Sequence, residues 1–292
     1  MKYTRKIKNT IYLKYLPKTR GGRIENLATF QVVCSSKDAH AKLKGIRTLK
    51  SPLESDDFIH VVFAKFGNKD LIVKIQEDGT RTFQRELEIQ EKLKNTNNII
   101  TFICDFICNF DDIIWNKPLE RPRYLCDEKG TPLHCIVMEY INSDLTDVLK
   151  TIENTDILIS ILQQLGLCLM NIHINYGVYH GDINKGNILV EKGEPKILTY
   201  TINNISYDVN TLGYECIFID FQRGGVIPLT NMETLLILTV NEISLTYELV
   251  SNCINPIYKD SIRALSHKVE EMKSIEQLST FITSFIPAPN GI

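Results

Sequence analysis

The densest group of polar residues able to do chemistry lies in the segment His180–Val190. Asp182 and Asn187 stand five residues apart within it, and a hydrophobic strand follows. A further aspartate, Asp220, ends a second hydrophobic strand. Carboxylate and amide oxygens are the ligands that Mg²⁺ takes beside the phosphates of a nucleotide. The pattern indicates phosphoryl transfer, with Asp182 accepting a hydrogen bond from the attacking hydroxyl and Asn187 and Asp220 holding the metal.

Two regions of different secondary structure are expected to position these residues, a strand-rich first half and a helix-rich second half. In the first half, the pattern predicts a hairpin over 58–66 and 71–76, a helix over 82–94, strands over 99–107 and 134–141, and a surface insertion over 111–133. In the second half, it predicts helices over 144–151, 156–176, 230–250 and 257–285, with short strands between the second and third. The prediction is an α+β, two-lobed molecule that binds its ligand near a linker at 139–143.

Composition and charge exclude several classes of protein. With 43% hydrophobic and 23% charged residues, the chain is neither disordered nor of low complexity. Its longest apolar stretch, 157–170, is expected to be a buried helix too short to span a membrane, and the first residues lack the apolar core of a secretory signal. Residues 1–23 hold eight Lys or Arg and no acid, so the remaining 269 residues carry a net charge of −10. This basic arm is either solvated or docked on the acidic body, or it contacts nucleic acid or another anionic partner.

Eight cysteines occur without regular spacing, several of them inside apolar strings. We expect buried free thiols, which are typical of a protein in the reducing interior of a cell. A zinc cluster is the alternative, and its candidate ligands are Cys104, Cys108, Cys126, His134 and Cys135. Because a C-x3-C spacing is unusual for structural zinc, free thiols are the favoured interpretation.

Two motifs of the second half resemble those of the protein kinase superfamily. HGDINKGNIL stands where the family has H-R-D-x-x-x-x-N, and Asp220-Phe221-Gln222 stands where it has D-F-G. The resemblance implies a two-lobed protein-kinase-like fold with a strand-rich N-lobe and a reduced helical C-lobe. It also implies ATP and Mg²⁺ as cofactors, with Asp182 as a catalytic residue. Asn187 and Asp220 would bind the nucleotide and the metal.

Three further matches lie upstream in the family's order. Lys74 matches the strand lysine that binds the α- and β-phosphates of ATP, and Glu86 matches the helix glutamate that pairs with this lysine. The hinge, whose backbone binds adenine, is matched by Glu139, Tyr140 and Ile141. Because all of the polar positions are kept, the resemblance favours an active enzyme.

The resemblance divides the chain into parts. Residues 1–23 form the basic arm, 24–138 the N-lobe and 139–292 the C-lobe, in which 195–219 is an extended hairpin. The hairpin and the tail are similar to those of haspin-type kinases, and kinases of large DNA viruses carry a similar hairpin. The haspin branch acts on the basic tail of histone H3. The resemblance therefore implies a serine/threonine protein kinase with a basic or histone-like substrate, monomeric, in the nucleus or cytoplasm, and away from membranes.

Departures from the family pattern leave two alternatives open. The glycine-rich loop is missing, and Glu54, Asp56 and Asp57 in its place would repel phosphate. Gly181 replaces an arginine that reads an activation-loop phosphate, and Asn184 replaces a lysine of serine/threonine kinases. The first alternative is a pseudokinase that acts as a binding or scaffold module. The second is a small-molecule kinase of the aminoglycoside or choline type.

Overall fold

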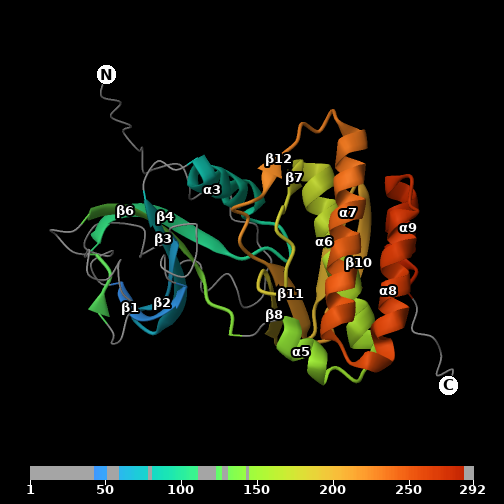
Figure 1. Ribbon diagram of the computed structural model, residues 1–292, viewed down its shortest axis with the longest axis horizontal. Coiled ribbons are helices and arrows are strands. Elements are labelled where there is room, and N and C mark those ends of the chain that lie inside the picture. Colours follow the sequence, from blue (N-terminus) through green and yellow to red (C-terminus); the bar gives the residue numbers. More distant parts are fainter. Residues whose placement is uncertain are drawn as a thin grey trace.

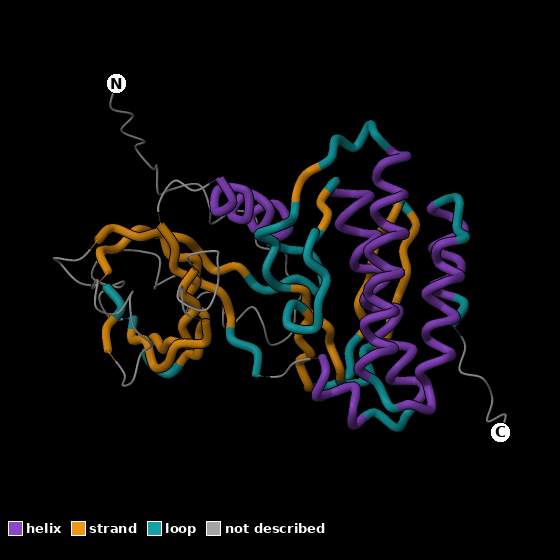
Figure 2. The backbone as a smooth tube through the Cα atoms, in the orientation of Figure 1, coloured by secondary structure: helices purple, strands orange, loops and turns teal. Residues whose placement is uncertain are grey.

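The computed structural model describes most of the chain, and its two lobes lie side by side in Figure 1. The residues described are 43–50, 59–77, 81–110, 123–126, 131–142 and 145–285. The basic arm of residues 1–23 lies outside them, as do the acids of 51–57 and most of the insertion predicted over 111–133. In Figure 2 one lobe consists mainly of strands, whereas the other holds most of the helices together with short strands, which confirms the two-lobed α+β prediction.

The N-lobe is a six-stranded antiparallel sheet in the order β4-β6-β3-β2-β1-β5. Its strands are β1 (Lys44–Lys50), β2 (Ile59–Phe66), β3 (Lys69–Glu77), β4 (Phe102–Phe110), β5 (Arg123–Tyr124) and β6 (Thr131–Glu139). β2 and β3 form the predicted hairpin. Side chains alternate along β3, so Val73 and Ile75 face the core of the lobe whereas Ile72 and Lys74 face the C-lobe.

Helix α3 (Arg81–Leu93) lies between the N-lobe sheet and the C-lobe and confirms the helix predicted over 82–94. Its apolar side chains pack against both lobes. Phe83 packs in a cluster with β4 and β6, whereas Ile89 and Leu93 belong to the core of the C-lobe. The helix is therefore held from both sides, which fixes the position of any side chain that it carries between the lobes.

The segment between α3 and β4 is anchored in the C-lobe. The side-chain amide of Asn98 donates hydrogen bonds to Oε1 of Gln164 at 3.2 Å and to the carbonyl of Cys216 at 2.6 Å. The hydroxyl of Tyr200 donates to Oδ1 of Asn98. Because these bonds draw the segment away from the sheet, β4 begins at Phe102, three residues later than predicted.

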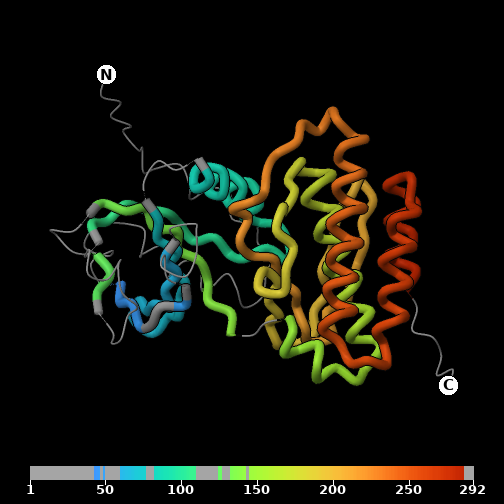
Figure 3. The backbone as a smooth tube through the Cα atoms, viewed as in Figure 1, coloured from blue at the N-terminus to red at the C-terminus, as the bar shows by residue number. Residues whose placement is uncertain are grey.

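The C-lobe is built around a central helix, α6, and the chain stays in this lobe from yellow-green through red in Figure 3. Its helices are α5 (Leu145–Thr151), α6 (Thr155–Tyr176), α7 (Met232–Cys253), α8 (Pro256–Glu270) and α9 (Ile275–Thr283). Gly177 ends α6 in the left-handed conformation, with φ 63°. The single helix predicted over 257–285 is two helices, because Ser274 caps a new start at α9.

By length and composition α6 is apolar enough to cross a membrane, unlike the shorter stretch considered in the sequence. However, 78% of its most apolar 18-residue window is buried inside the lobe. A long apolar helix surrounded by other elements is a core helix, so the predictions of a buried apolar stretch and of a helix over 156–176 are confirmed. The expectation that this stretch is too short to span a membrane does not hold for the whole helix.

Three small two-stranded sheets complete the C-lobe. Their strands are β7 (Val178–Tyr179), β8 (Ile188–Lys192), β9 (Ile197–Ile202), β10 (Ile205–Asn210), β11 (Tyr214–Phe218) and β12 (Gly225–Val226). The extended hairpin predicted over 195–219 is divided, because β9 pairs with β10 whereas β11 pairs with β8. Leu198, Tyr200 and Ile202 of β9 are buried in the core formed with α6.

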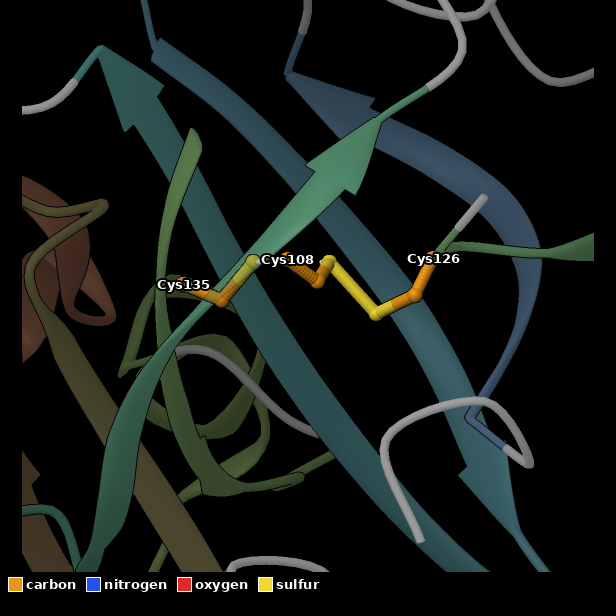
Figure 4. The surroundings of a disulfide bond; sticks show 3 residues. All are labelled: Cys108, Cys126 and Cys135. Atoms are coloured by element: carbon orange, nitrogen blue, oxygen red, sulfur yellow. Dashed lines mark hydrogen bonds between the residues drawn. A yellow bond between two sulfur atoms is a disulfide. The ribbon is translucent and has the colours of Figure 1, made fainter. Parts of the chain in front are cut away.

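The cysteines are not all free thiols, contrary to the prediction. Cys108 on β4 and Cys126 after β5 form a disulfide with a Cα–Cα separation of 5.4 Å, and Cys104 is disulfide-bonded as well. β4 and β5 are the two edges of the sheet, so the sheet curls until its edges meet. Cys135 keeps its thiol, with its Sγ 3.9 Å from that of Cys108 (Figure 4).

The zinc alternative is wrong for the same reason. Three of its candidate ligands are disulfide sulfurs, which are not thiolates and do not bind zinc. His134, a fourth candidate, stacks on Phe83 with ring centroids 4.6 Å apart. Within the described ranges, no group of three His, Cys, Asp or Glu side chains is placed to hold a metal ion.

Candidate active site

Lys74 of β3 is the centre of a charged site between the lobes. Its Nζ lies 2.8 and 2.7 Å from the two carboxylate oxygens of Glu86 on α3. The same Nζ lies 2.8 Å from Oδ1 of Asp220, which follows β11. Residues separated by up to 146 positions in the chain thus meet at one ammonium group. The structure brings together three of the residues that the motifs single out.

This cluster is buried at one end and open at the other. The side chains of Lys74 and Glu86 are 5% and 1% exposed, whereas that of Asp220 is 30% exposed. Burial lowers the pKa of the Lys74 ammonium, but Glu86 and then Asp220 more than offset this, so the pKa is raised above its ordinary value of 10.5. Lys74 is therefore charged at neutral pH. Asp220 is the member that an incoming ligand would reach first.

The backbone of Asp220 is unusual for a residue with a side chain. Its φ is +62°, in the left-handed region that non-glycine residues rarely occupy. The next residue, Phe221, is fully buried and packs 4.6 Å from the ring of His180. The strained conformation at Asp220 lets its carboxylate face Lys74 while Phe221 enters the core, and such strain is common at functional sites.

Asp182, on the loop between β7 and β8, is held by two asparagines. Nδ2 of Asn187 donates to Oδ2 of Asp182 at 3.1 Å and to its carbonyl at 2.9 Å. Nδ2 of Asn184 donates to the same carbonyl at 3.2 Å, and Oδ1 of Asn184 accepts the N–H of Gly186 at 2.9 Å. The Asp182 side chain remains 31% exposed. It is therefore both oriented and accessible, as a proton acceptor must be.

His180 connects this loop to the strand that carries Asp220. Its Nε2 hydrogen-bonds with the carbonyl of Ile219 at 2.9 Å, and the N–H of Asp182 donates to its Nδ1 at 3.3 Å. Burial lowers the pKa of His180, although nearby carboxylates raise it in part. A neutral, buried histidine that bonds on both sides holds the two loops in register, so His180 has a packing role.

A buried carboxylate supports the loop from below. Glu242 of α7 accepts the N–H of Gly181 at 2.6 Å and that of His180 at 3.0 Å. Its Oε2 also lies 2.8 Å from Nε2 of His173 on α6. Burial alone would raise the pKa of Glu242. The hydrogen bond and charge of His173, and then the two N–H groups, have the larger effect, so the pKa lies below its ordinary value of 4.5. Glu242 is therefore a charged anchor for the backbone just before Asp182.

The segment that follows Asp220 is short. Residues 221–231 lead directly to α7 and contain no helix, and β12 within them pairs with β7. Gly181 has φ +76°, and a Cβ at this position would lie 2.3 Å from the carbonyl oxygen of Arg223. Glycine is therefore required where the resembling family has arginine, because the returning segment lies directly against the loop.

The predicted hinge follows β6. The N–H of Glu139 donates to the carbonyl of Thr101 at 3.2 Å, and Oε1 of Glu139 accepts the N–H of Thr101 at 3.0 Å. The hydroxyl of Tyr140 donates to Oδ1 of Asn142 at 2.7 Å, and its ring lies 4.6 Å from that of Phe63. Since the Glu139 N–H is engaged within the protein, adenine would be bound by the other backbone groups of the hinge.

Apolar side chains from both lobes pack beside the hinge. The buried members of this cluster are Phe83, Ile100, Phe102, Ile136, Met138, Ile141 and Ile217. Ile72 of β3 and Leu189 of β8 are partly buried against it from opposite lobes. An apolar surface next to backbone hydrogen-bonding groups is the environment that suits a flat heterocyclic base.

The donor set for a metal consists of Asp220 and Asn187. Mg²⁺ uses one or two carboxylates and takes its remaining ligands from water and substrate phosphates. The partly exposed Asp220 carboxylate and the Asn187 amide oxygen are donors of this kind. These residues fit an Mg²⁺–nucleotide complex, and they would not suit a metal that prefers sulfur or imidazole.

Comparisons with known proteins bear on the fold. No family model and no curated protein matches the chain. Among solved structures, WaaP in complex with acyl carrier protein superposes with a TM-score of 0.50 at 12% identity, covering 84% of this chain and 88% of that one. The chain has a protein-kinase-like fold.

The likeness concerns the fold and not the haspin-like branch. In all, 1748 solved chains match, so the fold is common and does not by itself define a substrate. Any statement about the acceptor of a phosphoryl group therefore depends on the residues of this chain.

Three residues near the site were missed in the sequence. Glu242 could have been predicted from the sequence, because it lies on the apolar face of α7 and a buried glutamate needs a partner. The same holds for His173 in α6. The contact of Arg223 with Asp182, at 3.8 Å, has no local signal, because it depends on the path of the segment after Asp220.

Proposed function

We propose that the chain is a kinase that uses Mg²⁺ and transfers the γ-phosphoryl group of ATP to a Ser or Thr hydroxyl of a protein. The observation that carries the proposal is the meeting of Glu86 and Asp220 at the Lys74 ammonium, with Asp182 accessible nearby. This arrangement has a cation for phosphate, an oxygen donor for a metal and a proton acceptor. A module that only binds a partner would not need all three.

Each residue has a distinct part in the proposed reaction. Lys74, held by Glu86, presents its charge to the α- and β-phosphates. Asp220 and Asn187 would hold Mg²⁺, which neutralises phosphate charge when it is bound. Asp182 accepts the proton of the acceptor hydroxyl as its oxygen attacks the γ-phosphorus. The apolar cluster beside the hinge would hold the adenine.

The proposed acceptor is a basic protein segment, as the haspin resemblance implies. Outside residues 1–23 the net charge is −10, and a negative field raises the encounter rate with cationic peptides. Asp147 on α5 is 76% exposed near the linker, whereas Asp144 and the acids of 51–57 lie outside the described residues. Exposed charges act over only about 8 Å at physiological salt, so the preference should be strongest at low salt.

The proposed setting rests on the same resemblance. It is a monomer in the nucleus or cytoplasm, away from membranes, with the basic arm free to contact nucleic acid. The cysteines no longer support a reducing compartment, because Cys108 and Cys126 are joined. The location is therefore proposed from the resemblance alone.

A small-molecule acceptor is the second candidate. The observation that favours it is the short segment 221–231, which provides little surface beside Asp182 on which an extended peptide would lie. A saccharide hydroxyl would enter the same position as a Ser or Thr hydroxyl, so the chemistry at Asp182 would be unchanged.

The test is a transfer assay with radiolabelled ATP and Mg²⁺ on a panel of acceptors. The panel holds basic peptides, acidic peptides, sugars and aminoglycosides at low and high salt. We expect transfer to basic peptides at low salt and a steep decline as NaCl rises. Transfer to sugars alone would replace the protein substrate with the second candidate.

Matched variants separate catalysis from binding. Asp182→Asn should retain ATP binding, measured by thermal shift, and lose transfer, because the neutral amide accepts no proton. Asp260→Asn, an exposed aspartate on α8, is the control and should behave as the wild type. If the wild type gains no thermal stability from ATP and Mg²⁺, nucleotide binding and the proposed function are both wrong.

A further inference from the structure

Among the described residues, the motifs place no basic side chain in an ion pair with Asp182. During phosphoryl transfer, negative charge spreads over the oxygens of the γ-phosphoryl group, next to the carboxylate that receives the proton. Placed donors and cations at this point contribute much of the rate enhancement in such reactions. Lys74 is already bound to Glu86 and Asp220, and its ammonium is buried.

Arg223 is the cation that the described structure places there. Its Nη1 lies 3.8 Å from Oδ1 of Asp182, and 66% of its side chain is exposed. In contrast to Lys74, it is free to turn toward a ligand. Oδ2 of Asp182 is occupied by Asn187, so Arg223 approaches the opposite oxygen. An exposed ion pair of this kind contributes little to the stability of the fold. Arg223 is therefore available for a role in the reaction.

The backbone near Arg223 is fixed by close packing. A Cβ at Gly181 would lie 2.3 Å from the Arg223 carbonyl oxygen, and one at Gly224 would lie 2.7 Å from the carbonyl oxygen of Tyr179. The N–H of Gly224 also donates to the carbonyl of Phe221 at 2.9 Å. The returning segment therefore places the Cα of Arg223 reproducibly beside the loop, while its side chain keeps its freedom.

Neighbouring positions do not provide the same charge. Asn184 is neutral, and its amide is committed to the carbonyl of Asp182 and the N–H of Gly186. Lys185 is exposed next to it, but no ion pair with Asp182 is formed by it among the described residues.

We propose that Arg223 binds the γ-phosphoryl group of ATP and stabilises the charge that develops on it during transfer. This inference rests on the proposed function and adds a catalytic residue to it. A guanidinium is suited to the task because its N–H groups bind two phosphate oxygens at once and it stays charged throughout. Without ATP, the side chain lies beside Asp182.

The step balances without further reactants. The acceptor oxygen forms a bond to the γ-phosphorus, the bond from that phosphorus to the β,γ-bridging oxygen breaks, and ADP leaves. The acceptor proton passes to the carboxylate of Asp182. Arg223 neither gives nor takes a proton.

The experiment compares ATP and ADP binding to the wild type and to Arg223→Ala by titration calorimetry with Mg²⁺. Because only ATP carries the γ-phosphate, the variant should lose about tenfold in ATP affinity and keep its ADP affinity. In the transfer assay, kcat should fall roughly 100-fold, as when one donor to a transition-state oxygen is removed. The melting temperature should change by less than about 2 °C, because the pair is exposed.

Rescue distinguishes a missing charge from a damaged fold. Guanidinium ion, at concentrations well below those that unfold proteins, should restore part of the activity of Arg223→Ala, whereas urea should not. Arg263→Ala, an exposed arginine on α8, is the matched control and should bind ATP and ADP as the wild type does.

The outcomes are distinct. Unchanged ATP affinity and kcat in Arg223→Ala, with an active wild type, overturn the role of Arg223 and leave the proposed function standing. Equal losses for ATP and ADP overturn it too, because the γ-phosphate would then not be the group bound. A wild type that binds neither nucleotide overturns the proposed function, and the inference with it.

Discussion

The carboxylate of Glu242 accepts the backbone N–H of Gly181 at 2.6 Å, directly before the catalytic candidate Asp182. In Glu242→Gln, one oxygen becomes an NH₂ group, which cannot accept from an N–H group, and the charge opposite His173 is lost. We expect a loss of about 3 kcal/mol in the free energy of unfolding, measured in urea. Nucleotide binding should weaken less than transfer does, because the loop carries Asp182. Glu248→Gln, on the exposed side of the same helix, is the control and should change neither.

Stability should decline in two stages as the pH falls. Burial lowers the pKa of His180 below 6.5, so the folded protein resists its protonation and loses stability below that pH. The pKa of Glu242 is also lowered in the fold, so its contribution is complete above pH 4.5 and is lost as the pH falls through its folded value. Urea unfolding at a series of pH values should show both stages in the wild type and only the first in Glu242→Gln. Identical acid profiles would contradict the assignment.

Lys74→Met should destabilise the fold as well as abolish transfer. The change removes the cation shared by Glu86 and Asp220, and breaking a buried ion pair costs about 3–5 kcal/mol. The double variant Lys74→Met/Glu86→Gln should recover part of the stability and none of the activity, because glutamine carries no charge. Lys65→Met, which breaks the exposed pair with Asp70, should cost less than about 1 kcal/mol and serves as the control.

The disulfide should stabilise the N-lobe by closing its sheet. It joins residues separated by 18 positions, and a loop of that length stabilises by about 3 kcal/mol. Cys126→Ser should lower the melting temperature accordingly. Burial raises the pKa of the Cys135 thiol to about 12, so it should not exchange with the neighbouring disulfide at neutral pH. Peptide mapping without reductant should therefore find the Cys108–Cys126 pair, and a Cys108–Cys135 pair would contradict this.

Activity should not require phosphorylation of the segment after Asp220. Residues 221–231 contain one hydroxyl side chain, that of the exposed Thr230. Thr230→Ala should leave transfer unchanged, and phosphatase treatment of the wild type should have no effect. A large loss of activity in either experiment would show that this short segment is a switch.

The sequence predicts those parts of the site that are local in the chain. The spacing of Asp182 and Asn187 requires only one loop, and the alternation of β3 places Lys74 on one face. Contacts that depend on three-dimensional packing have no such pattern. Glu242 reaches Gly181 from α7, and Arg223 reaches Asp182 only because the returning segment is short.

The errors in the fold have the same origin. The start of β4 was predicted too early because apolar residues continue upstream, and the competing bonds of Asn98 to the C-lobe are not visible in the pattern. The disulfide was missed because Cys108 lies on β4 and Cys126 follows β5, at opposite edges of the sheet. Only the curl of that sheet brings them together.

The pairing of Thr101 with Glu139 has a mechanical consequence. Thr101 lies just before β4 and Glu139 ends β6, so both residues are close to the boundary between the lobes. Their reciprocal hydrogen bonds join these two segments to each other. We expect the two lobes to open and close by bending at this pair of segments. Sliding or twisting of one lobe against the other would instead break the hydrogen bonds of Asn98 to Gln164 and Cys216 in the C-lobe. Such bending would separate the lobes at Asp220 and Asp182, where the proposed nucleotide would enter and leave.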